Sequence, residues 1–379
     1  MAAERTQRLG ARPVGKDVVQ GERWRDYDLV MVLFLMMLLV LGATAVFSAS
    51  AGSRSEFYRQ LIYMGIGILA LIYLSLSDYR ALGRLYGVTY LVTLVLLVVV
   101  RVAGHRTLGA QREISLGLFE LQPSEISKLL IIIVLACFLS DRRGRIKDFS
   151  TFLVGLLLIL PPTVLILAQP DLGTALVYVG IYYGMAFVAG VPKRYLLGSL
   201  ALGAAALPLL VAHLHGYQRQ RLVVFFNPGA DPKGAGYNIL QAKIAVGSGG
   251  LLGKGFLTGT QGQLGFVPIR VTDFIFAIFS EEWGFVGALI LLCLFMVLLY
   301  RLLRAAHLAR DVYGRLLVSG VATMILFQMV VNIGMNLGVM PVVGIPLPFI
   351  SYGGSSMLTN LAGIGVVQSV LLRRRDVRF

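Results

Sequence analysis

An aspartate stands where the longest polar interval of the chain meets an apolar run. Asp273 follows a glycine-rich stretch that begins at Gly234, and the apolar residues after it begin at Phe274. A carboxylate at the mouth of a membrane helix is ionised at neutral pH and can act as a general base at the membrane surface. Thr-Asp before a helix also favours an N-cap, which stabilises a helix by about 1 kcal/mol. The residues alone leave both interpretations open.

A second charged group precedes another apolar run. Glu125 and Lys128 are three positions apart, directly after Pro123, and proline is typical of a first helical turn. That spacing puts the two side chains on one face of a helix, where they can form a salt bridge. The alternative is that Lys128 and Arg112 supply positive charge to an anionic group at the outer surface. Ionisable residues this near to hydrocarbon are costly, which favours a role for them.

Two further positions combine a helix start with polar or small residues. Asp171 precedes an apolar run and is interpreted either as an N-cap or as a contributor to a site. Gly353, Gly354 and Ser355 open the last apolar run, after a proline-containing stretch that cannot continue a helix. The free backbone N–H groups at such a start can hold an anion.

The interval 214–272 is too long for an ordinary connection, which indicates a function. Near its start, Arg219 and Arg221 lie beside aromatic residues, and they are interpreted either as interfacial anchors or as ligands of an anionic substrate. Residues 237–246 are expected to form a short helix that lies on the bilayer with Ile239 facing it.

The sequence argues against a phosphate-binding P-loop and gives no sign of a metal site built from Cys or His. The run around Lys254 is not a phosphate-binding P-loop, because Ser248 stands where that motif needs glycine and Gly255 where it needs serine or threonine. Its glycines instead favour close approach of the backbone to a ligand or a neighbour. Cys137 and Cys293 fall inside apolar runs, and the four histidines are scattered, so these residues predict neither a disulfide nor a metal site.

Polar residues also occur inside two apolar runs. Gln328, Asn332 and Asn336 recur every four residues and make a stripe along one helix face. Glu281 and Glu282 lie two turns beyond Asp273 and point away from it on an ideal helix. Hydrogen bonding between helices is the expected use of both groups, and the alternative is the lining of a transport path.

The elements that hold these residues are membrane helices. The chain has 379 residues, of which 57% are hydrophobic and 14% charged, whereas soluble domains have about 25% charged residues. The apolar residues come in blocks near the length that spans a bilayer, about 20 residues. The sequence therefore predicts an all-α polytopic membrane protein with about ten spans and one large outer loop between the seventh and the eighth. The expected spans are 28–48, 57–76, 85–103, 124–140, 150–168, 172–190, 195–213, 274–299, 316–340 and 355–372.

The basic residues predict the orientation. With residues 1–27 and 373–379 as cytoplasmic tails around a single domain of 28–372, the inner segments hold 22 of the 34 Lys and Arg. The net charge of +15 is thus explained by topology and by attraction to membrane lipids. Nucleic acid is excluded as a partner, because no basic face interleaved with aromatics lies on a soluble domain.

Five motifs resemble one known family. QPSEISK, QPDLGTAL, AVGSGGLLGKGFLTGTQ, TDFIFA followed by EEWG, and GVMPVVGIPLPFISYGGSS are similar to those of the shape, elongation, division and sporulation (SEDS) family, in the same order. The resemblance runs from the first span to the last. It implies a peptidoglycan glycosyltransferase that polymerises lipid II at the outer face of the bacterial cytoplasmic membrane, for cell elongation and rod shape. It also implies a class B penicillin-binding protein as partner.

The family's essential acid falls on Asp273, which the resemblance implies is the catalytic base. The leaving lipid pyrophosphate is a weak base and needs neutralisation by cations, from Lys128, Arg219, Arg221 or a divalent Mg or Mn ion. Two alternatives belong to other classes: a transporter that flips lipid II, and a non-catalytic scaffold for the partner. Motifs at the outer ends of spans favour surface chemistry, and a scaffold leaves the acid unexplained.

Overall fold

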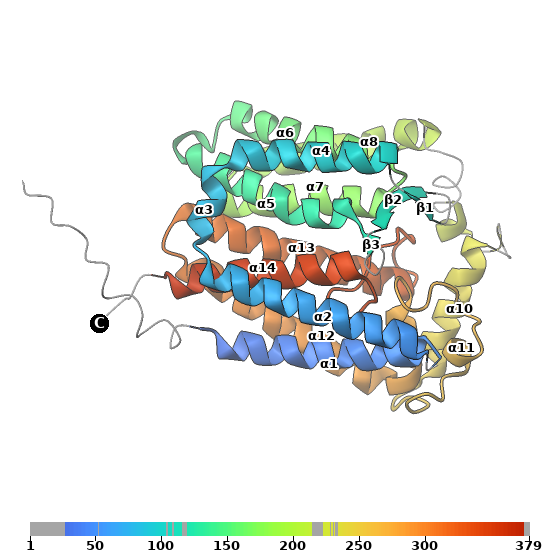
Figure 1. Cartoon of the computed structure of the whole chain (residues 1–379). Coiled ribbons are helices and arrows are strands. Elements are labelled where there is room, and N and C mark those ends of the chain that lie inside the picture. The colour runs from blue at the N-terminus through green and yellow to red at the C-terminus, as the bar shows by residue number, and fades with distance from the viewer. Residues whose placement is uncertain are drawn as a thin grey trace, which may run out of the picture.

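The computed structural model describes residues 27–51, 53–103, 105–107, 110–115, 120–213, 223–227, 229, 231 and 234–374. Most of these residues form long helices that run side by side along one axis (Figure 1). The helices are α1 (Leu29–Ala49), α2 (Arg54–Leu76), α3 (Tyr79–Arg84), α4 (Tyr86–Ala103), α5 (Pro123–Asp141), α6 (Phe149–Ala168), α7 (Leu172–Ala189), α8 (Lys193–His213), α10 (Ala235–Ser248), α11 (Thr260–Gln263), α12 (Ile275–Leu308), α13 (Val312–Asn336) and α14 (Gly354–Leu372).

Each of the ten predicted spans corresponds to one of these helices. The ends agree within four residues, except that α12 continues nine residues beyond its expected end. Within the described ranges, eight helices are long and apolar enough to cross a membrane. The other two predicted spans, α4 and α8, lie beside them in the bundle (Figure 1). The expected all-α polytopic membrane fold is confirmed.

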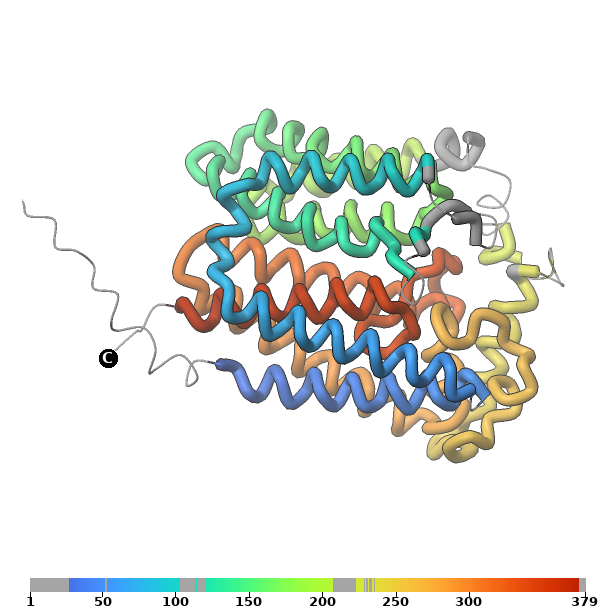
Figure 2. The backbone as a smooth tube through the Cα atoms, in the orientation of Figure 1, coloured from blue at the N-terminus to red at the C-terminus, as the bar shows by residue number. Residues whose placement is uncertain are grey.

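Three helices form the centre of the bundle. The apolar windows of α5, α13 and α14 are 78%, 78% and 89% buried, whereas those of α1, α2, α6 and α12 are 44% buried or less. A helix that is apolar on all sides and buried belongs to a core, and the outer helices present their apolar faces to lipid. Figure 2 shows α14, in red, between α13, in orange, and α2, in blue. Gly365 lets α14 approach α2 closely, because a Cβ atom there would meet the Leu71 carbonyl oxygen at 2.6 Å.

One end of the bundle carries the additional structure. A small antiparallel sheet of β1 (His105–Thr107), β2 (Ala110–Ser115) and β3 (Glu120–Leu121) follows α4, between two of the predicted spans. The same end holds α10 and α11 from the long interval before α12 (Figure 1). Ile239 of α10 is buried, and α10 packs against α12 and α13, so the expected apolar face contacts protein rather than bilayer.

The helix α12 is broken at Gly284, and the glycine-rich loop pairs with the break. Gly284 has φ 66° and ψ −164°, a conformation that favours glycine. The break frees the carbonyls of Glu281 and Glu282, which accept hydrogen bonds from Lys254 N and Gly255 N at 3.0 Å each. The loop glycines therefore serve close approach to a neighbouring backbone, which confirms one of the two uses predicted for them.

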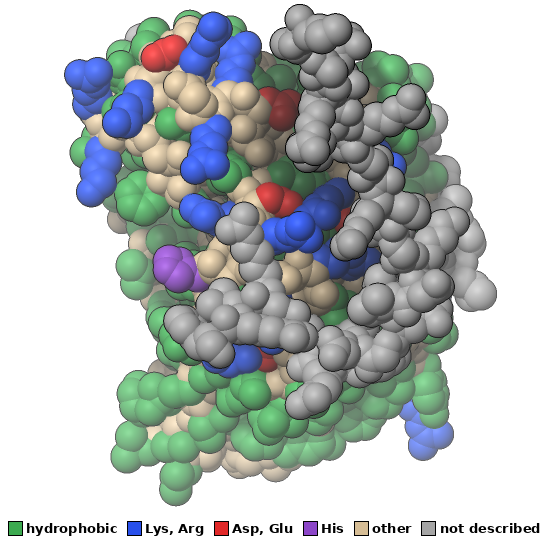
Figure 3. Space-filling model, turned by 90° about the vertical axis from the view of Figure 1, so that its left-hand side faces the viewer, with side chains coloured by type: hydrophobic (Ala, Val, Ile, Leu, Met, Phe, Trp, Pro, Cys, Tyr) green, Lys and Arg blue, Asp and Glu red, His purple; other side chains and the backbone are tan. Residues whose placement is uncertain are grey.

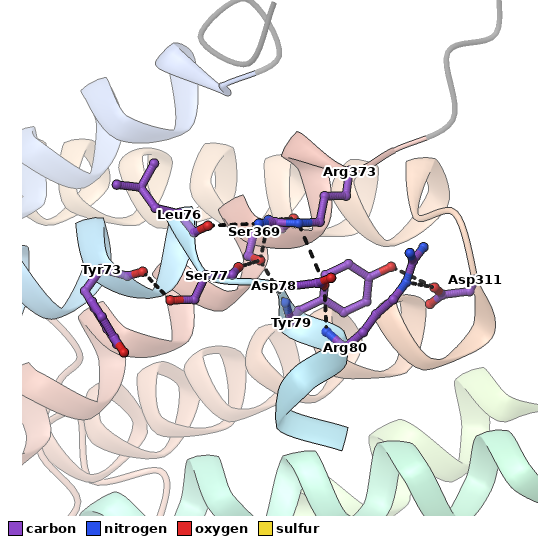
Figure 4. Close-up of polar contacts among 9 residues, drawn as sticks. All are labelled: Tyr73, Leu76, Ser77, Asp78, Tyr79, Arg80, Asp311, Ser369 and Arg373. Carbon is purple, nitrogen blue, oxygen red and sulfur yellow. Dashed lines mark hydrogen bonds and ion pairs between the residues drawn. The ribbon is translucent and has the colours of Figure 1, made fainter. Parts of the chain in front are cut away.

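The opposite end of the bundle carries the described ends of the chain, at Tyr27 and Arg374 (Figure 1). Lys and Arg side chains gather on this face in the view onto it (Figure 3). A polar network ties α2 and α3 to α13 and α14 there (Figure 4). Arg373 donates to the carbonyls of Leu76 and Ser369, and the Ser369 hydroxyl accepts from Tyr79 N at 3.2 Å.

Asp311 completes this network. It is the N-cap of α13, and its Oδ2 accepts from the Tyr79 hydroxyl at 2.7 Å and from Arg80 Nε at 3.2 Å. Burial by itself raises the pKa of Asp311, but the hydrogen bonds from Gly314 N–H, Tyr79 and Arg80 outweigh it, so the pKa lies below its usual value. Burial of the Tyr79 hydroxyl and its hydrogen bond to Asp311 raise the pKa of Tyr79 to about 12.

We expect Asp311→Ala to lower the free energy of unfolding by about 1 kcal/mol at neutral pH, the usual cost of a lost cap. Because the folded pKa is depressed, the contribution of the charge is present above the unfolded pKa of about 3.9 and is lost as pH falls through the folded value. Thermal unfolding in detergent at several pH values measures both effects. Asp311→Asn is the control, since it keeps the cap and removes the pH-dependent part. An unchanged pH dependence in the Asn variant would contradict this account.

Candidate active site

The backbone around Asp273 forms turns rather than the first turn of a helix. The helix α12 begins at Ile275, with Phe274 at its N-cap position. Asp273 is therefore not the N-cap of α12, and the expectation of a cap there is wrong. The chain turns at Ile269, whose carbonyl accepts from Phe274 N at 3.4 Å. Because of this turn, the helix starts only at Ile275. The side chain of Asp273 is partly exposed at this end of the bundle.

Two asparagines of α13 hold the Asp273 backbone from one side. The carbonyl oxygen of Asp273 accepts from Asn332 Nδ2 at 3.1 Å and from Asn336 Nδ2 at 3.0 Å. Asn336 Oδ1 in turn accepts from Ala277 N at 3.1 Å, in the first turn of α12. Both asparagines are fully buried. The prediction of hydrogen bonds between helices is thus confirmed for Asn332 and Asn336, and these bonds fix the backbone that bears the carboxylate. It is not confirmed for Gln328, whose buried side-chain amide has no hydrogen-bond partner within the described ranges.

The segment between α13 and α14 holds the same turns from the other side. The Ser351 hydroxyl donates to the Thr272 carbonyl at 2.7 Å, and Tyr352 N donates to the Val271 carbonyl at 2.9 Å. Asn332 also donates to the Ile345 carbonyl at 2.7 Å, which ties this segment to α13. Residues 271–273 are thus bonded through their carbonyls on two sides, an arrangement that preorganises a site. We call these bonds the Asp273 clamp.

Glu125 and Lys128 form the salt bridge that their spacing allows. Lys128 Nζ lies 2.6 Å from Glu125 Oε1, and the two side chains are only 1% and 4% exposed. Glu125 Oε2 has no hydrogen-bond partner within the described ranges. A buried charge pair needs both members, because removal of one leaves the other uncompensated. A direct contact of Lys128 with substrate stays a prediction.

Gln122, which precedes α5, joins the starts of three helices. Its backbone N–H donates to the Ser355 hydroxyl at 2.7 Å, and its side chain donates to Asp171 Oδ2 at 3.5 Å. Asp171 caps α7 by accepting from Thr174 N at 3.0 Å, so the cap interpretation holds for this aspartate. The Ser355 hydroxyl also donates to the Glu120 carbonyl at 3.1 Å. The structure therefore brings Asp171 and Ser355 together through Gln122.

The remaining predicted residues have different outcomes. Gly353 and Gly354 are the N-cap and first residue of α14, where the sequence places them, and anion binding by their N–H groups stays a prediction. Arg219 and Arg221 lie outside the described residues. The backbone of Arg112 lies in β2, and its side chain is outside the described part of the structure.

Two further cations, which belong to none of the motifs above, lie at this end of the bundle. Arg59 of α2 is exposed and acts electrostatically on the hydroxyl of Tyr352, the residue whose backbone N–H also holds Val271. Burial raises the pKa of the Tyr352 hydroxyl to about 12, Tyr63 adds to the rise, and Arg59 opposes it. Lys243 of α10 lies against Gly338, directly after α13. Arg59 falls inside the predicted span 57–76, and an arginine within a membrane span indicates a functional role.

Glu281 anchors the outer loop rather than lining a path. Its carboxylate is buried and accepts from Lys254 Nζ at 2.7 Å and from the backbone N–H groups of Gln261 and Gly262 at 3.0 and 3.2 Å. Charge-assisted bonds of this kind are about twice as strong as neutral ones. The loop before Asp273 is thus held to α12 at one point.

Metal ligands are sparse in the described ranges, which contain no group of three or more His, Cys, Asp or Glu side chains able to hold an ion. A Mg²⁺ ion can be held by one or two carboxylates together with substrate phosphates and water. The described residues therefore provide no ready set of protein ligands, and an ion at this site would take most of its ligands from the substrate.

The fold and the site together define a multi-pass membrane protein with a clamped, partly exposed carboxylate at one end of its bundle. The chain belongs to the FtsW, RodA and SpoVE family, whose model, described as cell cycle protein, matches residues 28–376. This confirms the resemblance carried by the five motifs.

Relatives of known activity cover nearly the whole chain. The peptidoglycan glycosyltransferase MrdB of Escherichia coli strain K12 is 40% identical over 349 residues, which cover 92% of this chain and 94% of MrdB. The peptidoglycan glycosyltransferase RodA of Treponema pallidum is 32% identical, over 92% of this chain and 98% of RodA. The chain is thus a glycosyltransferase, and the predicted enzyme class is confirmed.

Solved structures agree with the fold. RodA of Thermus thermophilus matches with a TM-score of 0.71 and 36% identity, over 93% of this chain and 98% of that chain. A chain from a peptidoglycan synthase complex that coordinates polymerization and crosslinking matches with a TM-score of 0.81 and 36% identity, over 92% of this chain and 99% of that chain.

Proposed function

We propose that this chain polymerises lipid II into peptidoglycan glycan strands at the outer face of the bacterial cytoplasmic membrane, during cell elongation, with Asp273 as the general base. The observation that carries the proposal is the Asp273 clamp. Four hydrogen bonds to the carbonyls of residues 271–273 hold a partly exposed carboxylate at the mouth of α12. A base must be held in place relative to the proton that it takes, because misplacement by about 1 Å can cost 10²-fold in rate.

The reaction follows from the two substrates. A sugar hydroxyl of the acceptor attacks the anomeric carbon of the donor, and the new glycosidic bond forms as the bond from that carbon to the pyrophosphate oxygen breaks. Asp273 takes the hydroxyl proton, and the lipid pyrophosphate leaves with the electron pair. One carboxylate suffices for this inverting displacement, because pyrophosphate leaves without a proton donor.

Positive charge must stabilise the leaving pyrophosphate. Lys128 is buried and paired with Glu125, so it is poorly placed to meet a lipid headgroup directly. Arg59 is exposed and lies near enough to Tyr352 of the clamp to act on its hydroxyl, which makes Arg59 the first candidate among the described residues. Arg112, Arg219, Arg221 and a Mg or Mn ion bound with the substrate remain in the proposal as further sources of positive charge.

The hydrogen bonds that the buried polar residues make within the protein favour surface chemistry over transport. Asn332, Asn336 and Glu281 donate or accept hydrogen bonds within the protein, and these bonds hold the Asp273 turns and the outer loop. A translocation path needs polar groups that face a water-filled cavity. The same residues therefore support a fixed site at the surface.

We further propose a class B penicillin-binding protein as partner, which would crosslink the strands that this chain makes. The peptidoglycan synthase complex with the same fold coordinates polymerization and crosslinking. We also place both termini in the cytoplasm, because the bundle end that carries Tyr27 and Arg374 gathers the basic segments (Figure 3).

We expect the purified protein to form glycan chains from lipid II in detergent, alone or with the partner synthase. The same protein in sealed vesicles is expected to leave the sidedness of labelled lipid II unchanged. Gel analysis of the glycan products measures the first result, and accessibility of the label to an external quencher measures the second. Translocation without polymer formation would overturn the proposal in favour of a transporter.

A further inference from the structure

A basic pocket lies at the end of the bundle opposite to Asp273. It has a volume of about 280 Å³ and is formed by the start of α1, the last turns of α12 and the end of α14. Its charged lining consists of Arg301, Arg304 and Arg374 together with Asp28. Among the described lining residues three cations face one carboxylate, so this lining carries more positive than negative charge and suits an anion.

One of the arginines is held in place by the protein. Arg301 Nη2 lies 2.6 Å from Asp28 Oδ2, and Arg301 Nε donates to the same oxygen at 2.8 Å. The other oxygen of Asp28 accepts from Met31 N at 3.0 Å and caps α1. Gln368 of α14 bonds the Asp28 backbone in both directions, at 3.2 and 3.3 Å. Asp28 thus joins the three helices, and its charge is used inside the protein rather than against a ligand.

The other two arginines provide the positive charge. Arg304 lies one turn beyond Arg301 on α12 and is exposed, and within the described ranges it makes no hydrogen bond or ion pair. Arg374 follows α14 at the other wall of the pocket. Arginine binds phosphate through parallel N–H bonds, and two arginines on different walls can hold one phosphate between them.

Apart from Tyr27, the rest of the described lining is apolar and continues onto the membrane-facing surface. Ala305 and Leu371 are 1% and 2% exposed and form the base of the pocket. Leu29 and Val30, at its rim, are 70% and 44% exposed and begin the most apolar of the membrane helices, α1. A ligand here therefore meets arginines on one side and a lipid-facing apolar wall on the other. A phospholipid carries both a phosphate and acyl chains, and an apolar wall that continues onto the lipid-facing surface of α1 suits the acyl chains.

We propose that this pocket binds the phosphate headgroup of an anionic phospholipid. Basic pockets between helices on the cytoplasmic side are the sites at which anionic lipids are recognised. The bound lipid would bridge α12 and α14 through Arg304 and Arg374, and its acyl chains would lie along the exposed face of α1. The site is separate from the proposed chemistry, because it lies at the other end of the bundle (Figure 1).

The test compares two double variants of the full chain that lose the same charge. Arg304→Gln/Arg374→Gln removes the pocket cations and keeps the Arg301–Asp28 pair. Arg143→Gln/Arg145→Gln is the control, because these arginines are exposed in the connection between α5 and α6 and lie outside the pocket. Binding of phosphatidylglycerol, phosphatidylcholine and inorganic phosphate is measured by native mass spectrometry of delipidated protein and by the shift in Tm.

We expect the pocket variant to lose affinity for phosphatidylglycerol by at least about tenfold, since one charge-assisted contact is worth that much. The control variant should stay within about threefold of wild type, as expected for surface charges. Phosphatidylcholine should bind weakly to all three proteins. Equal losses in the two variants would mean nonspecific attraction to basic residues and would overturn the proposal. So would displacement of phosphatidylglycerol by millimolar inorganic phosphate, which would identify a site for a soluble anion, or equal binding of phosphatidylcholine.

Discussion

Asp273→Asn is expected to lower the rate of glycan-chain formation by about 10²–10⁴-fold, the usual cost of a lost general base. Asparagine has nearly the same shape as aspartate but cannot take a proton at neutral pH. The clamp contacts the carbonyls of residues 271–273, which the substitution leaves in place, and α12 begins beyond them at Ile275. We therefore expect the Tm of the variant to stay close to that of wild type.

The measurement is polymerisation of lipid II by the purified variant, with and without its partner synthase, together with thermal unfolding. Asp171→Asn is the matched control, because Asp171 lies at the same end of the bundle and acts as an N-cap, which asparagine replaces well. The control should polymerise at a rate near that of wild type. If the Asp273 variant is stable and polymerises as fast as its control, the base is another residue.

Lys128→Met is expected to lower the free energy of unfolding by about 3–5 kcal/mol, because it leaves the buried Glu125 carboxylate without its partner. Glu125→Gln/Lys128→Met removes both charges at similar volume and should recover most of that loss, since an uncharged pair has no such desolvation cost. Thermal unfolding of Lys128→Met, of Glu125→Gln and of the double variant measures the coupling free energy between the two residues.

The activity of the double variant separates two roles for this pair. A purely structural salt bridge predicts that polymerisation returns together with stability. A contact of Lys128 with the pyrophosphate predicts a stable protein with impaired polymerisation. If Lys128→Met alone leaves the Tm unchanged, then the pair is not the buried ion pair that the structure describes.

The membrane helices could be predicted from the sequence because hydrophobicity is a local property. The fifth helix illustrates this: the apolar block 124–140 becomes Pro123–Asp141. The end of α12 was missed by nine residues, because Arg301 and Arg304 end the apolar signal while the helix continues. Arg301 is tolerated there by its pairing with Asp28, 273 positions away in the chain. The sequence pattern around Arg301 therefore could not predict Asp28 as its partner.

For the candidate site, too, local sequence determined some features and contacts between distant residues decided the others. The sequence by itself determined the bilayer-spanning blocks, the motifs of the family and the aspartate at the mouth of the eighth span. It also indicated that Asn332 and Asn336 share a helix face, because that depends on spacing within one helix. The tertiary structure alone decided what they bond, since their partner at Asp273 is 59 and 63 positions away. It likewise decided that Asp273 is not the N-cap of α12, because hydrogen bonds from distant residues hold residues 271–273 in turns and the helix begins at Ile275.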